Sequence, residues 1–396
     1  MKVLVINAGS SSLKAQFMDT ESAKVYCNIN CQRVGVGNSF ITYKVNGQKS
    51  DIPCEMNNHT EAFQAVLDTM LDKKIGVISS LDEIKAIGHR MVNFGEKYNH
   101  SIVITKEVFE DLKTRISFSP LHNTGALAGV EACLKLMPNL KNVAVFDTAF
   151  HSTMSEKAYI YAIPYELYTE NHIRRYGAHG TSHRFIAMEC EKLLGGLEGK
   201  KIISCHLGSG SSICAIKDGK CIDTSMGFTP LAGVVMGTRS GDLDPSAVKA
   251  IMEAKNLNID EATDLLNKQS GLIGLSGGYS DMRDIDAHLD EPRVKLAFDV
   301  MVYSIKKYIG AYAASMNGLD CLCFTAGIGE TDELVRSAVC KDMDYLGIEL
   351  DEEKNVSIPR RGDIELISTP NSKVKVYRIP TDEEFVIALD TEKLAK

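Results

Sequence analysis

The sequence predicts an α/β protein built from two related domains. Apolar runs typical of buried strands alternate along the chain with amphipathic helical segments. A strand, a turn rich in glycine and serine, and a second strand occupy residues 3–17, and the same order returns at residues 201–216. Because the two copies lie far apart in a chain of 396 residues, they indicate a duplication into two domains of ordinary size.

Composition restricts the class of partner. The net charge of −8 argues against a nucleic acid or an acidic membrane as partner, although it leaves room for a local basic pocket. No apolar stretch approaches the ~20 residues of a membrane helix, and the run after Lys2 is too short for a signal peptide. Eleven cysteines without paired-motif spacing are typical of reduced thiols. We therefore expect a cytoplasmic protein that binds small molecules.

The turn of the first copy is a candidate phosphate holder. Gly9 permits a tight turn. Serines that include Ser10 and Ser12 offer hydroxyls and amides that can surround an anion. Lys14 adds a point charge, and Asn7 at the strand end can reach a metal ion or its water. Taken alone, the segment also fits an ordinary serine-rich hairpin.

The second copy places Gly208–Ser212 between strands at 201–207 and 213–216. It predicts a second phosphate loop, so that each of two related domains would offer one loop to a cleft. Neither loop has the GxxxxGK[ST] spacing of a Walker A loop, and the sequence lacks the HRD and DFG motifs of protein kinases.

Further elements follow from hydrophobic periodicity and from capping residues. The expected helices cover residues 59–73, 106–115, 124–137, 245–255, 260–268 and 294–317. The expected strands include 84–88, 143–146, 319–324 and 374–379. We expect loops at 119–123 and 174–183 and a turn at 325–330, with Thr331 capping the next helix and 380–384 opening the last one. The domain boundary is expected within residues 152–165.

Polar clusters recur where the expected strands end, which is where ligands gather in open α/β sheets. They are Asn7–Ser12, His89-Arg90, His122-Asn123, Asp147, His206–Ser212, Arg239 and Gly327–Glu330. Each has an ordinary structural explanation, such as a surface ion pair for Arg90 or a helix cap for Asp147. Their recurrence at so many strand ends favours a ligand site. His179 and His183 lack the Glu of HExxH, which argues against zinc, and the absence of GxSxG argues against a hydrolase.

Longer motifs occur along nearly the whole chain. They are VLVINAGSSSLK at 3–14, GHRMV at 88–92, SPLHN at 119–123, VFDTAFH at 145–151, YGAHGTSH at 176–183, HLGSGSSI at 206–213, DTSMGFTPLAGVVMGTRSGDLDP at 223–245, NKQSGLIGLSG at 267–277, DMRD at 281–284, FTAGIGE at 324–330 and IPTDEE at 379–384. With these motifs the chain resembles the acetokinase family of short-chain acyl kinases.

The resemblance implies the duplicated, ribonuclease H-like fold of actin, Hsp70 and sugar kinases. It implies a first domain over residues 1–150, completed by a helix at 383–396, and a nucleotide-binding and dimerisation domain over 151–382. It also implies ATP/ADP as co-substrate, Mg²⁺ or Mn²⁺, a homodimer, and the reaction ATP + acetate ⇌ ADP + acetyl phosphate.

Matched residues take roles from the same resemblance. The implied catalytic residues are Asp147, His179 and Arg239, with His122 beside them. Arg90 would bind the acyl carboxylate, and the wall of the acyl pocket would comprise Val92, Leu121, Ala178 and Pro230. Asn7 and Glu383 match the magnesium site. The implied nucleotide contacts are Lys14, Ser10, Ser12, His206, Leu207, Gly208, Ser209, Gly210, Asp281, Met282, Arg283, Gly327, Ile328, Gly329, Glu330 and Thr331.

Such a reaction needs charge neutralisation more than a strong base. Carboxylic acids titrate near ~4, so the acceptor is already ionised at neutral pH. Its oxygen must lie in line with the γ-phosphorus, and Arg90, Arg239, Lys14 and the metal can supply positive charge. We expect Asp147 to orient an arginine or a metal-bound water rather than to abstract a proton.

Departures from the family pattern leave alternatives open. Ala178 stands where the family usually has Phe, which would enlarge the acyl pocket, and the ring of Phe94 offers one way to refill it. Ser209 is another departure, in the second phosphate loop. The alternatives are a propionate or butyrate kinase on the same scaffold, a sugar kinase, and a non-catalytic nucleotide-driven clamp. Pyrophosphate in place of ATP also stays open.

Overall fold

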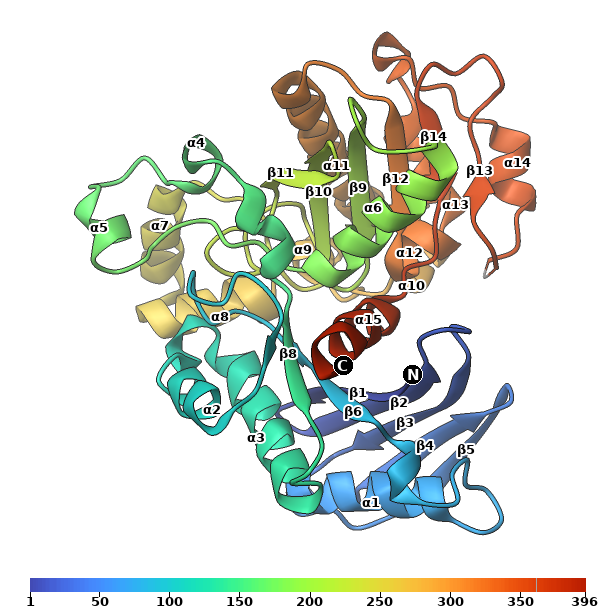
Figure 1. Cartoon of the computed structure of the whole chain (residues 1–396). Helices are drawn as coiled ribbons and strands as arrows, with labels where there is room; N and C mark the ends of the chain where they lie inside the picture. The colour runs from blue at the N-terminus through green and yellow to red at the C-terminus, as the bar shows by residue number, and fades with distance from the viewer. Residues whose placement is uncertain (361) are drawn as a thin grey trace. The chain divides into compact units, whose positions relative to one another are not determined.

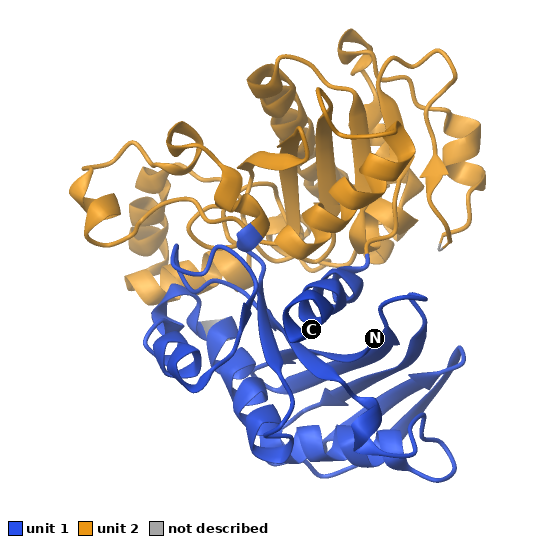
Figure 2. Cartoon of the chain, viewed as in Figure 1, with its two compact units in different colours: residues 1–149, 382–396 blue, residues 150–381 orange. Residues whose placement is uncertain are grey.

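The computed structural model describes residues 1–360 and 362–396, and the side chain of Leu121 lies outside the described part. The described chain divides into two compact units (Figure 2). Unit 1 comprises Met1–Ala149 and Asp382–Lys396, and unit 2 comprises Phe150–Thr381.

The sheet of unit 1 has the strand order β5-β4-β3-β2-β1-β6-β8-β7. Central strand β1 is antiparallel to β2 and parallel to β6, and β6 is parallel to β8. The strands are β1 (Lys2–Gly9), β2 (Ser12–Asp19), β3 (Val25–Gln32), β4 (Phe40–Val45), β5 (Gln48–Pro53), β6 (Ala86–Met91), β7 (Ile102–Val103) and β8 (Asn142–Phe146).

Helices cover both faces of this sheet (Figure 1). Leu4 and Ile6 of β1 pack in one core cluster with α1 (His59–Leu71) and α3 (Pro120–Leu136). Val3 and Val5, which point to the opposite face, pack against α15 (Glu383–Ala395). Residues 3–6 form an unbroken apolar run because both faces of the strand are buried. The other helical segments are α2 (Lys106–Lys113), η1 (Leu81–Glu83), η2 (Ile116–Phe118) and, at the border of the units, η3 (Ala149–Thr153).

The sheet of unit 2 has the strand order β11-β10-β9-β12-β14-β13. Strand β9 is antiparallel to β10 and parallel to β12, which is parallel to β14. The strands are β9 (Lys201–Leu207), β10 (Ser211–Lys217), β11 (Lys220–Thr224), β12 (Cys321–Thr325), β13 (Glu365–Leu366) and β14 (Lys375–Arg378). The order β11-β10-β9-β12-β14 repeats β3-β2-β1-β6-β8, with the same directions, so the predicted duplication and the α/β class are confirmed.

Helices also cover both faces of the second sheet. α11 (Pro292–Met316) packs on the face that carries Ile203 and Ile213, and α6 (Gly180–Leu194) packs on the face that carries Ile202 and Cys214. The remaining helical segments are α4 (Glu156–Tyr159), α5 (Glu166–Thr169), α7 (Pro245–Lys255), α8 (Ile259–Lys268), α9 (Gly271–Ser276), α10 (Met282–Ala287), α12 (Ala326–Thr331), α13 (Glu333–Cys340), η4 (Asp344–Leu346) and α14 (Glu352–Ser357). Among the described residues, no helix combines the length and the apolar character needed to cross a bilayer.

Several expected loops are wrong, because local capping extends the regular elements. The expected loop at 119–123 forms the first turn of α3, which begins at Pro120. The fixed φ of proline suits this position, and its missing N–H costs no hydrogen bond, because the first N–H groups of a helix have no partner within the helix. The expected turn at 325–330 forms most of α12. The next helix, α13, is capped by Asp332 rather than by Thr331, since the Asp332 carboxylate accepts from the amide of Val335 at 3.0 Å.

The strand ends also differ from expectation. Strand β1 continues through Asn7 to Gly9, and Gly9 pairs with Ser12, so the first phosphate-loop candidate is a two-residue hairpin turn. Strand β6 continues to Met91 and therefore includes His89 and Arg90. The last residues of the expected loop at 174–183 begin α6 at Gly180.

Candidate functional site

The polar residues of unit 1 gather around a buried ion pair. The Arg90 Nη2 atom donates to Asp147 Oδ2 at 2.7 Å, and Nε lies 3.2 Å from both carboxylate oxygens. Arg90 lies on β6 and Asp147 follows the neighbouring parallel strand β8, so the sheet brings the pair together. The Asp147 side chain is 1% exposed and the Arg90 side chain 26%. Burial raises the pKa of Asp147, while the Arg90 charge opposes this rise. Arg90 therefore binds a fixed carboxylate and still presents an edge to solvent.

Other charged groups surround this pair. Glu383 in the first turn of α15 raises the pKa of Asp147, and His122 in the first turn of α3 lowers it, so both lie within electrostatic range. Burial raises the pKa of Glu384, and Glu383 adds to the rise. The structure thus places His122 and Glu383 within electrostatic range of the Arg90–Asp147 pair, whereas the sequence analysis had assigned Glu383 to the metal site and His122 to the surroundings of His179 and Arg239.

Asn7 and Lys14 lie opposite each other in the β1–β2 ladder. Together with Glu384 they line a hollow of about 240 Å³ on the sheet of unit 1. Ser10 at the hairpin tip is exposed and Ser12 is half-buried. An amide oxygen and a carboxylate at one hollow are ligands that Mg²⁺ accepts, together with phosphate and water. The sequence analysis named Glu383 and missed Glu384, although both follow Asp382 in one acidic run.

The polar residues of unit 2 gather around His179. This residue precedes α6 with a left-handed backbone, φ 58°. Its Nδ1 atom lies 2.9 Å from Ser212 Oγ, and its ring stacks on His206 with centroids 4.0 Å apart. The same Ser212 hydroxyl lies 2.7 Å from His183 Nε2. Burial lowers the pKa of His183 far below its ordinary value, so this imidazole is neutral and supports His179 through Ser212.

Arg239 lies beside His179. A Cβ atom at Gly210 would stand 3.4 Å from Arg239 Nη1 and 3.5 Å from the His179 ring, so both side chains border the glycine loop. Arg239 Nη1 also donates to the carbonyl oxygen of Pro230 at 3.2 Å. Burial lowers the Arg239 pKa, and a guanidinium remains charged at neutral pH. The predicted residues His179, Arg239, Gly210 and Pro230 are therefore neighbours.

The expected wall residues of the acyl pocket occupy different surroundings. Ala178 is buried and clusters with Met226 and Met236 of unit 2. Val92 is half-buried in unit 1, and the Leu121 side chain lies outside the described residues. Phe94 is fully buried in the core of unit 1, where its ring meets that of Phe146 edge-on at 5.8 Å. The core of unit 1 holds the Phe94 ring in this position, and its contribution to the acyl pocket stays a prediction.

A second hollow, which lies in unit 2 and has a volume of about 340 Å³, collects half of the predicted nucleotide contacts. The predicted residues that line it are Gly208, Ser209, Asp281, Met282, Arg283, Gly327, Ile328 and Thr331. The Arg283 guanidinium pairs with the Asp281 carboxylate, with Nη2 2.6 Å from Oδ2. The sequence analysis missed other lining residues, namely Ser280, Asp286, Asp332 and Arg360. Burial and the neighbouring Asp332 raise the pKa of Asp286 to about 7.

Other predicted nucleotide contacts do not line this hollow. Leu207 is 1% exposed and belongs to the hydrophobic core of unit 2. Gly329 packs against the backbone of Phe324, and Glu330 accepts a hydrogen bond from the Thr381 amide at 3.0 Å. His206 contacts His179 and donates to, or accepts from, Ser182 Oγ at 2.8 Å. These residues support the loops rather than form the hollow.

Comparisons with known proteins agree over the whole chain. A model of the Acetokinase family matches residues 2–389. An acetate kinase from Thermotoga maritima is 49% identical over 400 residues, which cover 100% of this chain and 99% of the relative. Among solved structures, the acetate kinase of Porphyromonas gingivalis is 44% identical, covers 100% of both chains and has a TM-score of 0.96. A propionate kinase from Francisella tularensis is 37% identical, covers 99% of both chains and has a TM-score of 0.91.

Proposed function

The chain belongs to the acetokinase family, and we propose that its two sets of polar residues carry out phosphoryl transfer from ATP to acetate. The family resemblance is confirmed, and the fold is the duplicated one of actin, Hsp70 and sugar kinases. The protein is thus a kinase with a carboxylate acceptor and ATP/ADP as co-substrate. The roles given below to single residues are our proposal.

The observation that carries the proposal is the Arg90–Asp147 pair. Asp147 engages Nε and Nη2 of Arg90, and the guanidinium keeps further N–H groups for a substrate carboxylate. Arg90 binds acetate and holds one oxygen as the nucleophile. Asp147 fixes the plane of the guanidinium and needs no proton transfer, because acetate is ionised at neutral pH. His122 adds a hydrogen-bonding group beside the pair.

His179 and Arg239 act on the phosphoryl group. Arg239 neutralises charge on the equatorial oxygens as they move from ADP to acetate. His179 donates a hydrogen bond from Nε2 to one of these oxygens, since its Nδ1 is held by Ser212. Ser212, His183 and the stacked His206 keep the imidazole in place. Because the imidazole is already in place, no reorganisation energy is needed at the moment of transfer.

The nucleotide occupies the hollow that is lined by Asp281–Arg283 and by Gly327, Ile328 and Thr331. The glycines allow the adenosine to approach the backbone closely. Lys14 supplies a point charge for the phosphates. Asn7, Glu383 and Glu384 would hold Mg²⁺ or Mn²⁺ through their oxygen atoms, and the bound ion would neutralise phosphate charge.

We also propose a cytoplasmic homodimer. Unit 2 exposes large apolar side chains on α11, where Leu296 is 54% and Tyr303 66% exposed. Such side chains favour contact with a second copy over contact with water. The free state of the cysteines agrees with a reducing compartment.

Trapping the product with hydroxylamine tests the function. Hydroxylamine converts an acyl phosphate to a hydroxamate. With ATP and acetate, the rate of hydroxamate formation should therefore be proportional to the enzyme concentration. A panel of C2 to C4 acids, with ATP and pyrophosphate as donors, compares the alternatives in one experiment. A higher kcat/KM for propionate or butyrate would favour the alternative acyl kinases. Phosphorylation of a sugar without hydroxamate, or nucleotide binding without turnover, would contradict the proposal.

A further inference from the structure

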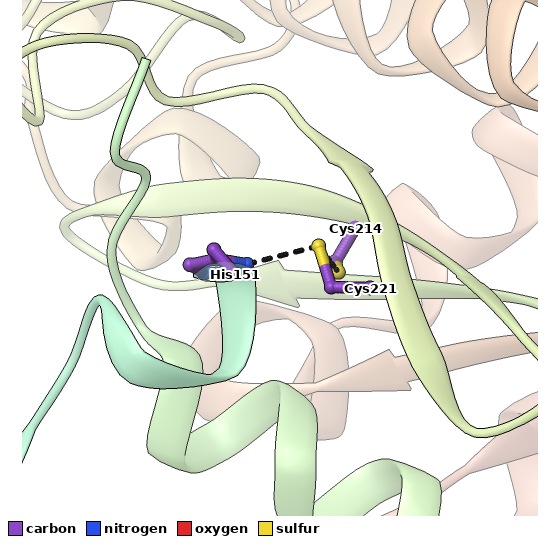
Figure 3. Close-up of side chains that lie close together, drawn as sticks. All are labelled: His151, Cys214 and Cys221. Carbon is purple, nitrogen blue, oxygen red and sulfur yellow. Dashed lines mark hydrogen bonds between the residues drawn. The ribbon is translucent and has the colours of Figure 1, made fainter. Parts of the chain in front are cut away.

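A second cluster of reactive side chains lies in unit 2, separate from the nucleotide hollow. His151 of η3, Cys214 of β10 and Cys221 of β11 turn their side chains toward one point (Figure 3). The His151 Nδ1 atom lies 3.1 Å from Cys221 Sγ, and Cys221 Sγ lies 3.5 Å from Cys214 Sγ. All three ligand atoms lie within 4.8 Å of one another, and all three side chains are fully buried.

A backbone carbonyl fixes the imidazole of His151 for metal binding. His151 Nε2 lies 2.8 Å from the carbonyl oxygen of Ala178. Because a carbonyl only accepts, Nε2 carries the proton and Nδ1 directs its lone pair at Cys221. Thr153 Oγ1 donates to the carbonyl oxygen of Cys221 at 2.7 Å and fastens η3 to β11. This is how ligating histidines are held in metal sites, with the second nitrogen donating to an outer partner.

The separations given above between the ligand atoms are close to those around a tetrahedral thiophilic ion. With bonds of about 2.3 Å to sulfur and about 2.0 Å to nitrogen, a tetrahedral ion separates two sulfurs by about 3.8 Å and sulfur from nitrogen by about 3.5 Å. The His151–Cys221 and Cys214–Cys221 separations therefore need to open by only a few tenths of an ångström. Two thiolates and a neutral imidazole also cancel the charge of a divalent ion, which matters in a site without solvent.

We propose that His151, Cys214 and Cys221 bind a divalent thiophilic cation of the Zn²⁺ class. Binding replaces the two thiol protons, so that M²⁺ and two Cys–SH give a neutral dithiolate complex and two H⁺ in solvent. A further oxygen, the carbonyl oxygen of Asp223, lies 3.5 Å from Cys221 Sγ. The bound ion would tie η3 to the sheet and hold the Ala178 carbonyl that immediately precedes His179.

Another thiol cluster provides a control within the same unit. Cys190 of α6 lies 3.4 Å from Cys323 of β12, which lies 3.5 Å from Cys321. It offers three sulfurs and no imidazole, so its ligand set differs from that of the proposed site. Replacing Cys190 with alanine removes a member of this control cluster and leaves His151, Cys214 and Cys221 in place.

X-ray absorption at the zinc edge tests the proposal without altering the site. The full-length Cys190→Ala variant is refolded with Zn²⁺, because the buried site needs an opening of the chain for entry, and is then freed of excess metal. We expect one zinc per chain with two sulfurs at about 2.3 Å and nitrogen at about 2.0–2.1 Å. A shell of oxygen and nitrogen alone, or failure to retain zinc, would overturn the proposal.

A series of refoldings at increasing Cd²⁺ concentration, read from thiolate-to-metal absorbance, supplies the second test. Adding Cys221→Ser to the Cys190→Ala background should weaken binding by more than the ~10–100-fold that follows loss of an outer partner. Unchanged affinity would also overturn the proposal. Circular dichroism checks that the double variant folds. If it does not fold, the X-ray absorption measurement on the Cys190→Ala variant decides whether the site binds zinc. Neither readout needs turnover, so their outcome is independent of the kinase function.

Discussion

The guanidinium of Arg90 and the carboxylate of Asp147 form an ion pair at 2.7 Å between two neighbouring parallel strands of one sheet. Asp147 is almost completely buried, whereas Arg90 is partly exposed. The buried Asp147 carboxylate thus holds the Arg90 guanidinium from its buried side. Removing one member of such a pair leaves the other charge buried without compensation.

The first prediction concerns Asp147→Asn. Asparagine keeps the size of the side chain but cannot pair with a guanidinium, so Arg90 loses its fixed orientation. We expect kcat/KM for acetate to fall by about 10²-fold and the unfolding free energy to fall by about 3–5 kcal/mol. Steady-state kinetics and thermal denaturation measure the two effects.

Asp111→Asn is the matched control, because Asp111 pairs with Lys97 and Arg115 near the surface of the same unit. Its kcat/KM should equal that of the wild type. If Asp147→Asn also kept wild-type kcat/KM, Asp147 would not be the residue that orients Arg90.

The second prediction concerns the two arginines. Arg90→Ala and Arg239→Ala should each lower kcat/KM by at least ~10²-fold, because each removes a charged contact made in the transition state. Arg33→Ala, which removes an arginine at the exposed end of the sheet of unit 1, should leave kcat/KM unchanged. Near-wild-type activity in a folded Arg90 or Arg239 variant would remove that residue from the mechanism.

The third prediction concerns pH and Asp286. Burial and Asp332 raise the pKa of Asp286 to about 7 in the folded protein, while an unfolded aspartate titrates near ~3.9. Between these values the folded state binds more protons than the unfolded state, so stability is lost as pH rises through the window. Asp286→Asn removes this loss. We expect its Tm to exceed that of the wild type by about 2 °C or more at pH 8, with the gain shrinking toward pH 5.

Asp284→Asn, at an exposed position of the same helix α10, controls for the loss of one negative charge. Its Tm difference from the wild type should not depend on pH. A Tm difference for Asp286→Asn that stays constant from pH 5 to pH 8 would show that Asp286 is ionised throughout this range.

The fourth prediction concerns acyl chain length. Ala178 packs beside Met226 and Met236, whose flexible side chains can yield to a longer substrate. One methylene is worth only ~1–3 kcal/mol of discrimination. We expect propionate to be used with a kcat/KM within ~10-fold of acetate, and Ala178→Phe to widen the gap. Competition kinetics across the C2 to C4 acids measure the ratio. Strong rejection of propionate by the wild type would show that the methionines already fill the space.

Sequence patterns predicted the duplicated fold because buried strands and Gly/Ser turns leave a local signature in each half. They also singled out Arg90, Asp147, His179 and Arg239 as candidate site residues, whose roles stay a prediction. Sequence patterns did not predict contacts between residues that are far apart in the sequence. The carboxyl pair Asp286–Asp332 depends on the approach of α10 to the N-terminus of α13, which no local pattern reveals. The role of Ser212 between His179 and His183 depends on the placement of α6 against β10.

Failures at element ends have a different cause. The loop expected at 119–123 is helical because Pro120 suits the first turn of a helix, a fact that a search for periodicity alone does not use. Phe94 stood near a family motif in the sequence, but its edge-on contact with Phe146 in the core of unit 1 determines where its ring lies.

The central claim is that these side chains position and neutralise two substrates and that none of them accepts the phosphoryl group. The stereochemistry at a chiral, isotopically labelled γ-phosphorus of ATP tests this claim most directly. A single in-line displacement by acetate inverts the configuration, and inversion in the acetyl phosphate is the result we predict. Retention would reveal two successive displacements through a phosphorylated side chain and would contradict the account.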